Sequence, residues 1–397
     1  MAEWDVIVIG AGPAGLTAAR VAAENGLSVL CLDKKQEIGI PVRCAEGMGL
    51  GIFKNQNIPI KQEYCVWPIE GAALYAPSGK KVEIRFPETS GYIVERRIFE
   101  KFLARWAAKA GAKIKVKSNV VKAERNNGKV KVFYEHFDEM LEEEAKIIIS
   151  AEGVEAKIAR QLGLNTTNNL NDIDSGFQYE MAGINFDEPE LIHLYFGKEV
   201  AYRGYVWIFP KGKNEANVGV GVGGLAPKKA KEYLDAFIKK HEGLKDGSVI
   251  AVNAGGIPVG GFLENMTRDN LLVCGDAAHQ VNPIHGGGIG LAIEAARIAA
   301  EVAAEAVKQK NYSEQFLKKY NELWYEKRGN KLKRILKMRY MLENLNDEDF
   351  ETIASSLNGD DIMKIAEGDI LQSAKIISTK LVKHPGLVKI MLKYLQS

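Results

Sequence analysis

A glycine pattern between a buried strand and a helix constrains this 397-residue chain more than any other feature. The near-continuous apolar run from Trp4 to Ile9 is typical of a parallel strand that is buried on both faces. The glycine segment Gly10-Ala11-Gly12-Pro13-Ala14-Gly15 follows it, and apolar residues at helical spacing then continue to Asn25-Gly26, a helix stop. A second strand over 28–32 completes a βαβ unit, and its first strand is predicted to be central in the sheet.

Each glycine of this G-x-G-x-x-G pattern has a physical reason. Gly10 permits the tight turn, Gly12 lets the backbone approach a pyrophosphate, and Gly15 allows the helix to pack closely on the strand. The helix N-terminus adds free N–H groups and a positive dipole. Asp33, at the end of the second strand, can accept hydrogen bonds from ribose hydroxyls. The pattern predicts a Rossmann-type dinucleotide site rather than a turn with a surface aspartate.

A second motif near residue 276 distinguishes FAD from NAD. The segment 270–279 reads as a strand that ends in Gly275-Asp276, and a helix opened by glycines begins near Gly288 and Ile289. This arrangement would place Asp276 against the ribityl hydroxyls and the helix N-terminus against the pyrimidine edge of a flavin. An NAD dehydrogenase has no need for such a segment, so the predicted cofactor is FAD.

The remaining elements indicate a discontinuous domain organisation. Hairpins are predicted around 72–86 and 126–134, a helix over 95–110, and turn-rich strands over 177–254. We therefore expect an α/β chain with a Rossmann-type FAD-binding domain, an inserted antiparallel-sheet substrate domain and a helical C-terminal region. The expected boundaries are 1–65, 94–165 and 260–325 for the FAD-binding domain, 66–93 and 166–259 for the substrate domain, and 326–397 for the helical region.

Composition excludes several classes of protein. A net charge of +2 gives no reason to expect nucleic acid. The four cysteines, at positions 31, 44, 65 and 274, have no metal-type spacing, so we expect no metal and no iron–sulfur centre. The apolar run at 6–9 is far too short for a membrane span or a signal peptide, and no transmembrane helix is predicted.

The two FAD motifs together resemble the flavoprotein superfamily of aromatic hydroxylases. In detail the chain is similar to its geranylgeranyl reductase family, the archaeal enzymes that saturate the isoprenoid chains of membrane lipids. The loop over 41–47 and the helix entry over 94–99 carry this resemblance, which runs over nearly the whole chain. It implies cofactor contacts from Gly10, Gly12, Ala14, Gly15, Asp33, Cys44, Ala45, Gly47, Arg96, Val120, Asp276, Gly288 and Ile289. Arg96 is also plausible on its own chemistry, since a fixed cation suits a pyrophosphate.

The substrate signature of that family, P-x-x-Y-x-W-x-F-P, fits the segment 202–210 except at its first position, where Tyr202 replaces proline. On a strand, the rings of Tyr205, Trp207 and Phe209 would point to one side and suit a polyisoprenoid chain. The resemblance implies that these three residues and Pro210 bind substrate. The alternative is that the rings are core residues of the second domain.

The resemblance implies FAD-dependent reduction of the C=C bonds of geranylgeranyl chains on archaeal glycerophospholipids. An isolated alkene has no carbonyl to accept charge, so protonation has to help. The hypothesis is that Trp207 or Tyr205 stabilises the developing cation and that Tyr205, Cys44 or a buried water supplies the proton. Cys44 is expected in the active-site wall, with inert packing or a bridge to Cys65 as alternatives. External electrons would come from a ferredoxin or a nicotinamide.

Three other functions stay open at this point. A flavin monooxygenase is disfavoured because Glu152 and Gly290 stand where aromatic hydroxylases usually carry aspartate and asparagine; Glu152 is instead expected to be a solvated loop carboxylate. An electron-transfer flavoprotein dehydrogenase is the second, but that type commonly pairs its flavin with an iron–sulfur cluster, which four scattered cysteines cannot build. A non-catalytic, flavin-stabilised isoprenoid carrier is the third. For His279 and His285, structural roles are at least as expected as catalytic ones.

Two basic apolar stretches lie near the C-terminus, at 327–340 and 375–395. The first carries seven lysines or arginines up to Arg339, and the second has five lysines and no acidic residue. Such helices can lie on an anionic membrane surface, or they can present a solvated lysine face over a buried one. We expect a peripheral protein at the cytoplasmic face of the cell membrane.

Overall fold

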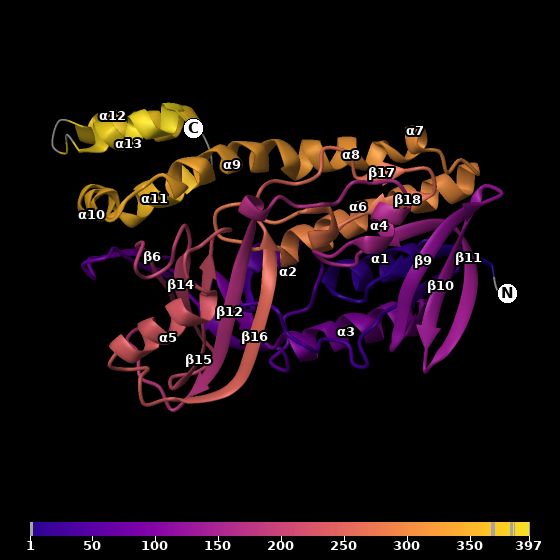
Figure 1. Cartoon of the computed structure of the whole chain (residues 1–397), viewed down its shortest axis with the longest axis horizontal. Coiled ribbons are helices and arrows are strands. Elements are labelled where there is room, and N and C mark those ends of the chain that lie inside the picture. The colour runs from indigo at the N-terminus through magenta and orange to yellow at the C-terminus, as the bar shows by residue number, and fades with distance from the viewer. Residues whose placement is uncertain (1–2, 367–369, 382–383, 385, 397) are drawn as a thin grey trace.

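The computed structural model describes residues 3–366, 370–381, 384 and 386–396. Two large sheets lie side by side, and the C-terminal helices run along one side of both (Figure 1). The predicted α/β class, with a Rossmann-type domain and a helical C-terminal region, is confirmed.

The first sheet is built on parallel strands, with β1 at its centre. Its order is β17-β18-β11-β1-β2-β8, and the hairpin strands β9 and β10 extend from β11. The strands are β1 (Glu3–Ile9), β2 (Val29–Leu32), β8 (Lys113–Lys115), β9 (Ser118–Asn126), β10 (Lys129–His136), β11 (Glu139–Ser150), β17 (Thr267–Arg268) and β18 (Leu271–Val273). β1 pairs in parallel with both β2 and β11, so its apolar run is buried as the sequence predicts.

Helices cover this sheet and share its core. They are α1 (Pro13–Glu24), α3 (Arg96–Lys109), α4 (Lys157–Gln161), α6 (Ile289–Gln309), α7 (Glu314–Leu317) and α8 (Lys319–Trp324). α1 is rich in alanine and has Pro13 at its first position, where proline has no hydrogen bond to lose. Its small side chains let α1 lie close to β1 and α6, which brings the N-termini of both helices to one edge of the sheet.

The second sheet has seven strands in the order β16-β12-β15-β14-β13-β5-β6. They are β5 (Gly71–Tyr75), β6 (Lys81–Arg85), β12 (Ile173–Ala182), β13 (Leu191–Tyr195), β14 (Tyr205–Pro210), β15 (Glu215–Val222) and β16 (Ser248–Pro258). Neighbours are antiparallel except β13 and β5, which pair in parallel because β5 joins from a distant part of the chain. Helix α5 (Ala230–Lys240) covers one face; the prediction of strands alone over 177–254 is wrong there.

A small third sheet connects the two large ones. It contains β3 (Gly47–Gly49), β7 (Gly91–Val94) and β4 (Cys65–Ile69), and α2 (Leu50–Asn55) follows β3. Thus only the middle of the segment 66–93 joins the second sheet. Its two ends, in β4 and β7, pair with each other, and β7 also pairs with β3, the strand that begins at Gly47.

The described part of the C-terminal region consists of helices joined by short loops. A π-helical turn (Tyr325–Gly329) leads into α9 (Asn330–Glu343), and α10 (Asp347–Ser356), α11 (Gly359–Ala366), α12 (Ile370–Leu381) and α13 (Leu387–Gln396) follow. Short 3₁₀ turns lie at Leu170–Asp172 and Gly275–Ala278. α10 to α13 share an apolar cluster and lie beyond the end of the second sheet (Figure 1). Lys383 and Pro385 of the second basic stretch are outside the described residues.

Candidate active site

One cavity of about 1510 Å³ runs between the two large sheets and under the C-terminal helices. Pockets for a single small molecule usually measure about 300 to 1,000 Å³. Its lining begins at the glycine loop after β1, passes the loops around Cys44 and Asp276, and ends among apolar residues of α10 to α13. The cavity therefore has room for a dinucleotide and a second, apolar ligand.

The glycine loop fits a pyrophosphate. Gly10 has a left-handed φ of +100°, and a Cβ there would lie 2.3 Å from the carbonyl oxygen of Ala151. A Cβ on Gly15 would lie 1.7 Å from the carbonyl oxygen of Gly10. Gly12 differs, because a Cβ there would meet no protein atom within 4 Å. Gly10 and Gly15 are thus required by packing, whereas Gly12 keeps a space open at the N-terminus of α1.

Asp33 holds the glycine loop from the end of β2. Its Oδ2 accepts a hydrogen bond from the backbone N–H of Ala11 at 2.5 Å, and its Oδ1 accepts one from the N–H of Lys35 at 2.8 Å. The side chain is 4% exposed and lines the cavity. Ala14 and Val120 also line this end. The position suits the predicted ribose contact, and the carboxylate also fixes the loop.

The second motif forms the adjoining wall. Gly275 adopts a left-handed φ of +70°, which turns the chain after β18, and burial raises the pKa of Asp276 although Arg96 opposes the shift. Gly288 is the N-cap of α6 and has no side-chain cap, so the N–H groups of the first turn have no side-chain partner there. Asp276, Gly288 and Ile289 all line the cavity, where a flavin could accept these hydrogen bonds.

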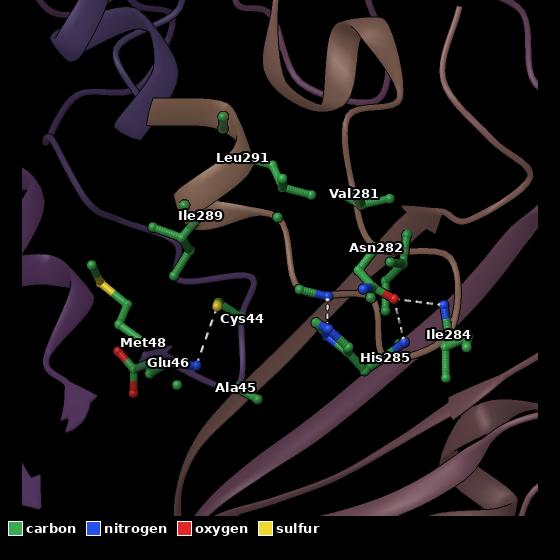
Figure 2. Close-up of a pocket in the computed structure, with 18 of the residues that line it drawn as sticks. Cys44, Ala45, Glu46, Met48, Val281, Asn282, Ile284, His285, Ile289 and Leu291 are labelled. Atoms are coloured by element: carbon green, nitrogen blue, oxygen red, sulfur yellow. Dashed lines mark hydrogen bonds between the residues drawn. The ribbon is translucent and has the colours of Figure 1, made fainter. Parts of the chain in front are cut away.

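The Cys44 loop faces this segment across the cavity. Figure 2 shows Cys44, Ala45 and Glu46 on one side and the segment from Val281 to Leu291 on the other. The Cys44 sulfur accepts a hydrogen bond from the N–H of Glu46 at 3.1 Å, and burial raises the pKa of this thiol against the effect of Arg96. Cys44 and Cys65 are both free thiols, so the bridge left open by the sequence is not formed.

Arg96 supplies a buried cation beside this loop. It begins α3, lines the cavity and forms an ion pair with Glu100, another lining residue. Its Nε is buried and has no hydrogen-bond partner among the described residues. An unpaired guanidinium N–H in a cavity is suited to an anionic ligand such as a pyrophosphate.

Strand β14 places three aromatic rings on the cavity side. Tyr205, Trp207 and Phe209 line the cavity, while Val206 and Ile208 belong to the core under α5, as the period of two predicts. Pro210, predicted with them as a substrate contact, is buried and does not line the cavity. Because Pro210 directly follows Phe209 on the strand, its side chain belongs to the opposite face of the sheet.

An apolar chamber extends from Trp207. Trp207 is in register with Leu194, Leu194 with Leu74, and Leu74 with Val82, so one row crosses four strands on the cavity face. The opposite wall comes from the C-terminal helices. Its members include Leu332, Ile335, Met341, Phe350, Ile377 and Ile390. Of the two expectations for the basic stretches, a membrane surface or a lysine face over a buried one, this wall fits the buried face for α9, and the spacing of Leu332, Ile335 and Met338 signals that face.

A buried charge cluster anchors the Cys44 loop. Glu46 is 2% exposed; it accepts hydrogen bonds from the backbone N–H of Arg96 at 2.8 Å and the Asn217 amide at 2.7 Å. Lys211 lies 3.3 Å from Glu46 and pairs with Glu95 at 2.8 Å and Glu180 at 2.6 Å. Glu46 and Glu95 lie in the segments 41–47 and 94–99, but no local motif pairs them with Lys211, because these contacts join distant segments.

Replacing Lys211 with methionine is expected to lower the free energy of unfolding by about 3 to 5 kcal/mol, since buried carboxylates lose their cation. Burial already raises the pKa of Glu46 and Lys211 opposes that shift, so without the lysine Glu46 takes up a proton more readily. The loss of stability should therefore be smaller at pH 5 than at pH 8. Urea unfolding at both pH values measures it. Lys231→Met, at an exposed pair with Asp235, should leave stability unchanged.

Glu152, His279 and His285 each have a defined hydrogen-bond partner in the structure. Glu152 is not a solvated carboxylate: it accepts hydrogen bonds from the N–H groups of Ile158 and Ala159 at 2.9 and 3.1 Å and so caps α4. His279 is buried and its Nε2 lies 3.2 Å from the carbonyl oxygen of Thr166, a structural role. His285 lines the cavity, and its Nδ1 accepts the N–H of Gly287 at 3.1 Å.

Comparison with known proteins identifies the family. Residues 172–257 match the family model of the geranylgeranyl reductase catalytic domain, and residues 3–214 and 258–324 match that of an FAD binding domain. The chain is 40% identical over 389 residues to digeranylgeranylglycerophospholipid reductase 1 of Methanosphaera stadtmanae, covering 96% of each chain. It is 41% identical to the digeranylgeranylglycerophospholipid reductase of Methanocaldococcus jannaschii, covering 97% of each. The chain belongs to the digeranylgeranylglycerophospholipid reductase family.

Solved structures agree with this placement. A geranylgeranyl bacteriochlorophyll reductase-like protein from Thermoplasma acidophilum superposes with a TM-score of 0.88 at 35% identity, covering 99% of both chains. A flavin-dependent brominase superposes with a TM-score of 0.71 at 17% identity, covering 92% of this chain and 94% of its own, and shows the shared fold alone. As a member of the digeranylgeranylglycerophospholipid reductase family, the chain is an FAD-dependent oxidoreductase, and the cradle of Gly10, Gly12, Asp33 and Arg96 is suited to FAD.

Proposed function

We propose that this protein saturates the C=C bonds of geranylgeranyl chains on archaeal glycerophospholipids, in membrane lipid biosynthesis. The observation that carries the proposal is the apolar chamber, which opens directly into the FAD cradle within one cavity. An isoprenoid chain along the row from Val82 to Trp207 would bring its double bonds to the Cys44 loop. The names of the archaeal relatives support this substrate.

The side chains of the chamber contribute exclusion of water and stabilisation of charge. When bound in its reduced form, FAD supplies the electrons for the reaction. Protonation of an isolated double bond develops positive charge on carbon, and the Trp207 ring on the cavity wall is placed to stabilise it. The apolar lining strengthens that interaction, because little water is present to screen it.

The structure bears on the three proton sources that the sequence suggested. The hydroxyl of Tyr205 donates to the carbonyl oxygen of His285 at 2.7 Å, and burial raises its pKa, with Asp174 adding to the shift. Burial also raises the pKa of Cys44. Both groups are therefore weaker acids than usual, and we propose that a water molecule held in the cavity delivers the proton.

The test is an anaerobic single turnover. Protein reduced with dithionite is mixed with a digeranylgeranyl glycerophospholipid, and flavin reoxidation and lipid mass are followed together. A gain of two hydrogen atoms for each reduced double bond, in step with reoxidation, supports the proposal. An unchanged lipid contradicts it, and a hydroxylated or epoxidised product in air would establish a monooxygenase instead. We further propose an external electron donor, a ferredoxin or a nicotinamide, because the sequence has no second dinucleotide pattern.

We also propose peripheral contact with the cytoplasmic face of the membrane through α13. No helix in the described part of the chain is long and apolar enough to cross a bilayer. In α13, Leu387 and Ile390 line the cavity, while Val388 and Leu392 are 40% and 50% exposed on the outside. A short helix that is apolar on both faces and covers a lipid chamber suits a membrane interface. Lys389 and Lys393 contribute less charge than expected, because both pair with Asp349 on α10.

Changing both Val388 and Leu392 to aspartate is expected to weaken binding to anionic lipid vesicles by about tenfold or more, since two apolar side chains no longer enter the interface. Vesicle flotation measures the bound fraction. The matched control changes Val249 and Ile250 to aspartate as well. These residues are 47% and 58% exposed on the edge strand β16, and this variant should bind vesicles as the wild type does. Equal binding by all three proteins would exclude α13 as the contact.

A further inference from the structure

The three rings of β14 contact both loops that face the flavin cradle. Tyr205 donates its hydroxyl hydrogen bond to His285 of the segment 281–291. The Phe209 ring lies against Gly47, where an added Cβ would be only 2.8 Å from Cε2. Trp207 reaches the loop of Cys44 indirectly, through Gln178. The strand is therefore more than an apolar wall, because each of its cavity-facing rings is also tied to a cofactor loop.

Gln178 is the link between Trp207 and Cys44. It lies on β12, is 3% exposed and lines the cavity. Its Oε1 accepts the indole N–H of Trp207 at 2.9 Å, and its Nε2 donates to the carbonyl oxygen of Cys44 at 3.0 Å. An indole N–H can only donate and a carbonyl can only accept, so chemistry allows the amide a single orientation.

The register of the sheet makes this link possible. Gln178 pairs with Gly219 on β15, and Gly219 pairs with Trp207 on β14, so the three residues form one cross-strand row. A Cβ on Gly219 would lie 2.4 Å from the indole ring. Because the middle position of the row has no side chain, the indole can lie over it and reach the amide two strands away.

The remainder of the Cys44 loop has other anchors, and the Cys44 sulfur accepts from the N–H of Glu46, but the Cys44 carbonyl oxygen depends on Gln178. The amide of Asn217 donates to the carbonyl oxygen of Ala45 at 3.2 Å, and Glu46 is held by its charge cluster. Within the described part of the chain, Gln178 is the only hydrogen-bond partner of the Cys44 carbonyl oxygen. Loss of Gln178 would leave that carbonyl unpaired in a half-buried loop.

We propose that Gln178 is a positioning residue that couples the Trp207 ring to the Cys44 loop and so fixes the spacing between substrate wall and cofactor loop. The hydrogen bonds stand without any ligand; only the consequence for turnover rests on the proposed function. Gln178 holds together strand β14 of the second sheet and the loop that precedes β3. Its effect on the reaction is therefore expected in kcat rather than in the binding of FAD or lipid.

The first test measures the accessibility of Cys44 in the FAD-loaded protein. Gln178→Met keeps the side-chain length but removes both hydrogen bonds, and iodoacetamide should then alkylate Cys44 about tenfold faster, as followed by peptide mass. Cys31 and Cys274 are fully buried and serve as internal references. Gln178→Glu, which keeps the acceptor for Trp207 but loses the donor to Cys44, should show the same increase.

A matched control separates positioning from general loss of stability. Asn321 is another buried amide with both ends bonded: it accepts from the N–H of Met266 at 3.0 Å and donates to Asn265 at 2.7 Å, outside the cavity lining. Asn321→Leu should lower the melting temperature without changing the rate of Cys44 alkylation. Equal acceleration in this control would overturn the proposal, because the effect would then be global.

The second test uses coupling between the two positions. Trp207→Phe removes the indole N–H, and adding it to Gln178→Met should accelerate Cys44 alkylation no further than Gln178→Met alone. Lipid turnover by Gln178→Met should show a lower kcat and an unchanged lipid KM. Cys44 alkylation within twofold of wild type in a folded Gln178→Met protein overturns the proposal. If the wild type reduces no lipid, the proposed function fails, while the alkylation comparison still decides the link.

Discussion

Replacing Trp207 with leucine is expected to slow the reduction of the lipid by about 30-fold while FAD and lipid still bind. The ring lies on the cavity wall at 6% exposure, and a desolvated cation–π contact contributes about 2 kcal/mol. Because about 1.4 kcal/mol corresponds to a tenfold change in rate, the loss falls in this range. The rate of flavin reoxidation by excess lipid, under anaerobic conditions, measures it directly.

Trp207→Phe distinguishes the ring from its N–H group. Phenylalanine keeps an aromatic face toward the cavity but cannot donate to Gln178, so it should be slower than wild type and faster than Trp207→Leu. The difference in turnover rate between Trp207→Phe and Trp207→Leu measures the contribution of the aromatic ring. If they are equally slow, stabilisation of a cation by the ring is wrong and the hydrogen bond accounts for the whole effect. Full turnover by Trp207→Leu with normal lipid binding would contradict both roles.

The parts of this site that the sequence predicts are those encoded by short-range spacing. The glycine loop follows from the six residues 10–15, whose conformations depend on one another locally, and Gly10 and Gly15 meet their backbone neighbours as that spacing requires. The rings of Tyr205, Trp207 and Phe209 share a side because a strand alternates with a period of two. By the same rule Pro210 belongs to the opposite side, and it does not line the cavity.

The remainder of the site depends on contacts between distant segments. Gln178 meets Cys44 from 134 positions away, and Asn217 meets Glu46 from 171, so no local pattern could pair them. One other omission did have a signal. Tyr233, Leu234 and Phe237 have the helical spacing of α5. The apolar spacing of α9 fits a buried face as well as a membrane surface, and its charges do not distinguish the two.

The second large effect is expected at Gly12. A Cβ there meets no protein atom within 4 Å, so Gly12→Ala should leave the melting temperature of the FAD-free protein unchanged. The same methyl group would occupy the space in which a pyrophosphate is expected to approach the helix N-terminus. Crowding of this kind costs about 1 to 3 kcal/mol, which corresponds to a roughly 5- to 150-fold weaker Kd for FAD. Titration of the FAD-free protein with FAD, followed by flavin fluorescence, measures that Kd.

Gly15→Ala provides the opposite pattern, because its Cβ would lie 1.7 Å from the carbonyl oxygen of Gly10 and no flexible side chain can move aside. It should lower the free energy of unfolding of the FAD-free protein by about 3 kcal/mol or more. If both variants bind FAD more weakly but only Gly15→Ala destabilises the FAD-free protein, then Gly12 is required for the approach of the ligand and Gly15 is required for packing. If Gly12→Ala binds FAD as tightly as wild type, the pyrophosphate does not lie at Gly12. If instead Gly12→Ala unfolds as readily as Gly15→Ala, the space beside Gly12 is needed by the chain itself, and the cradle is not open as the structure shows it.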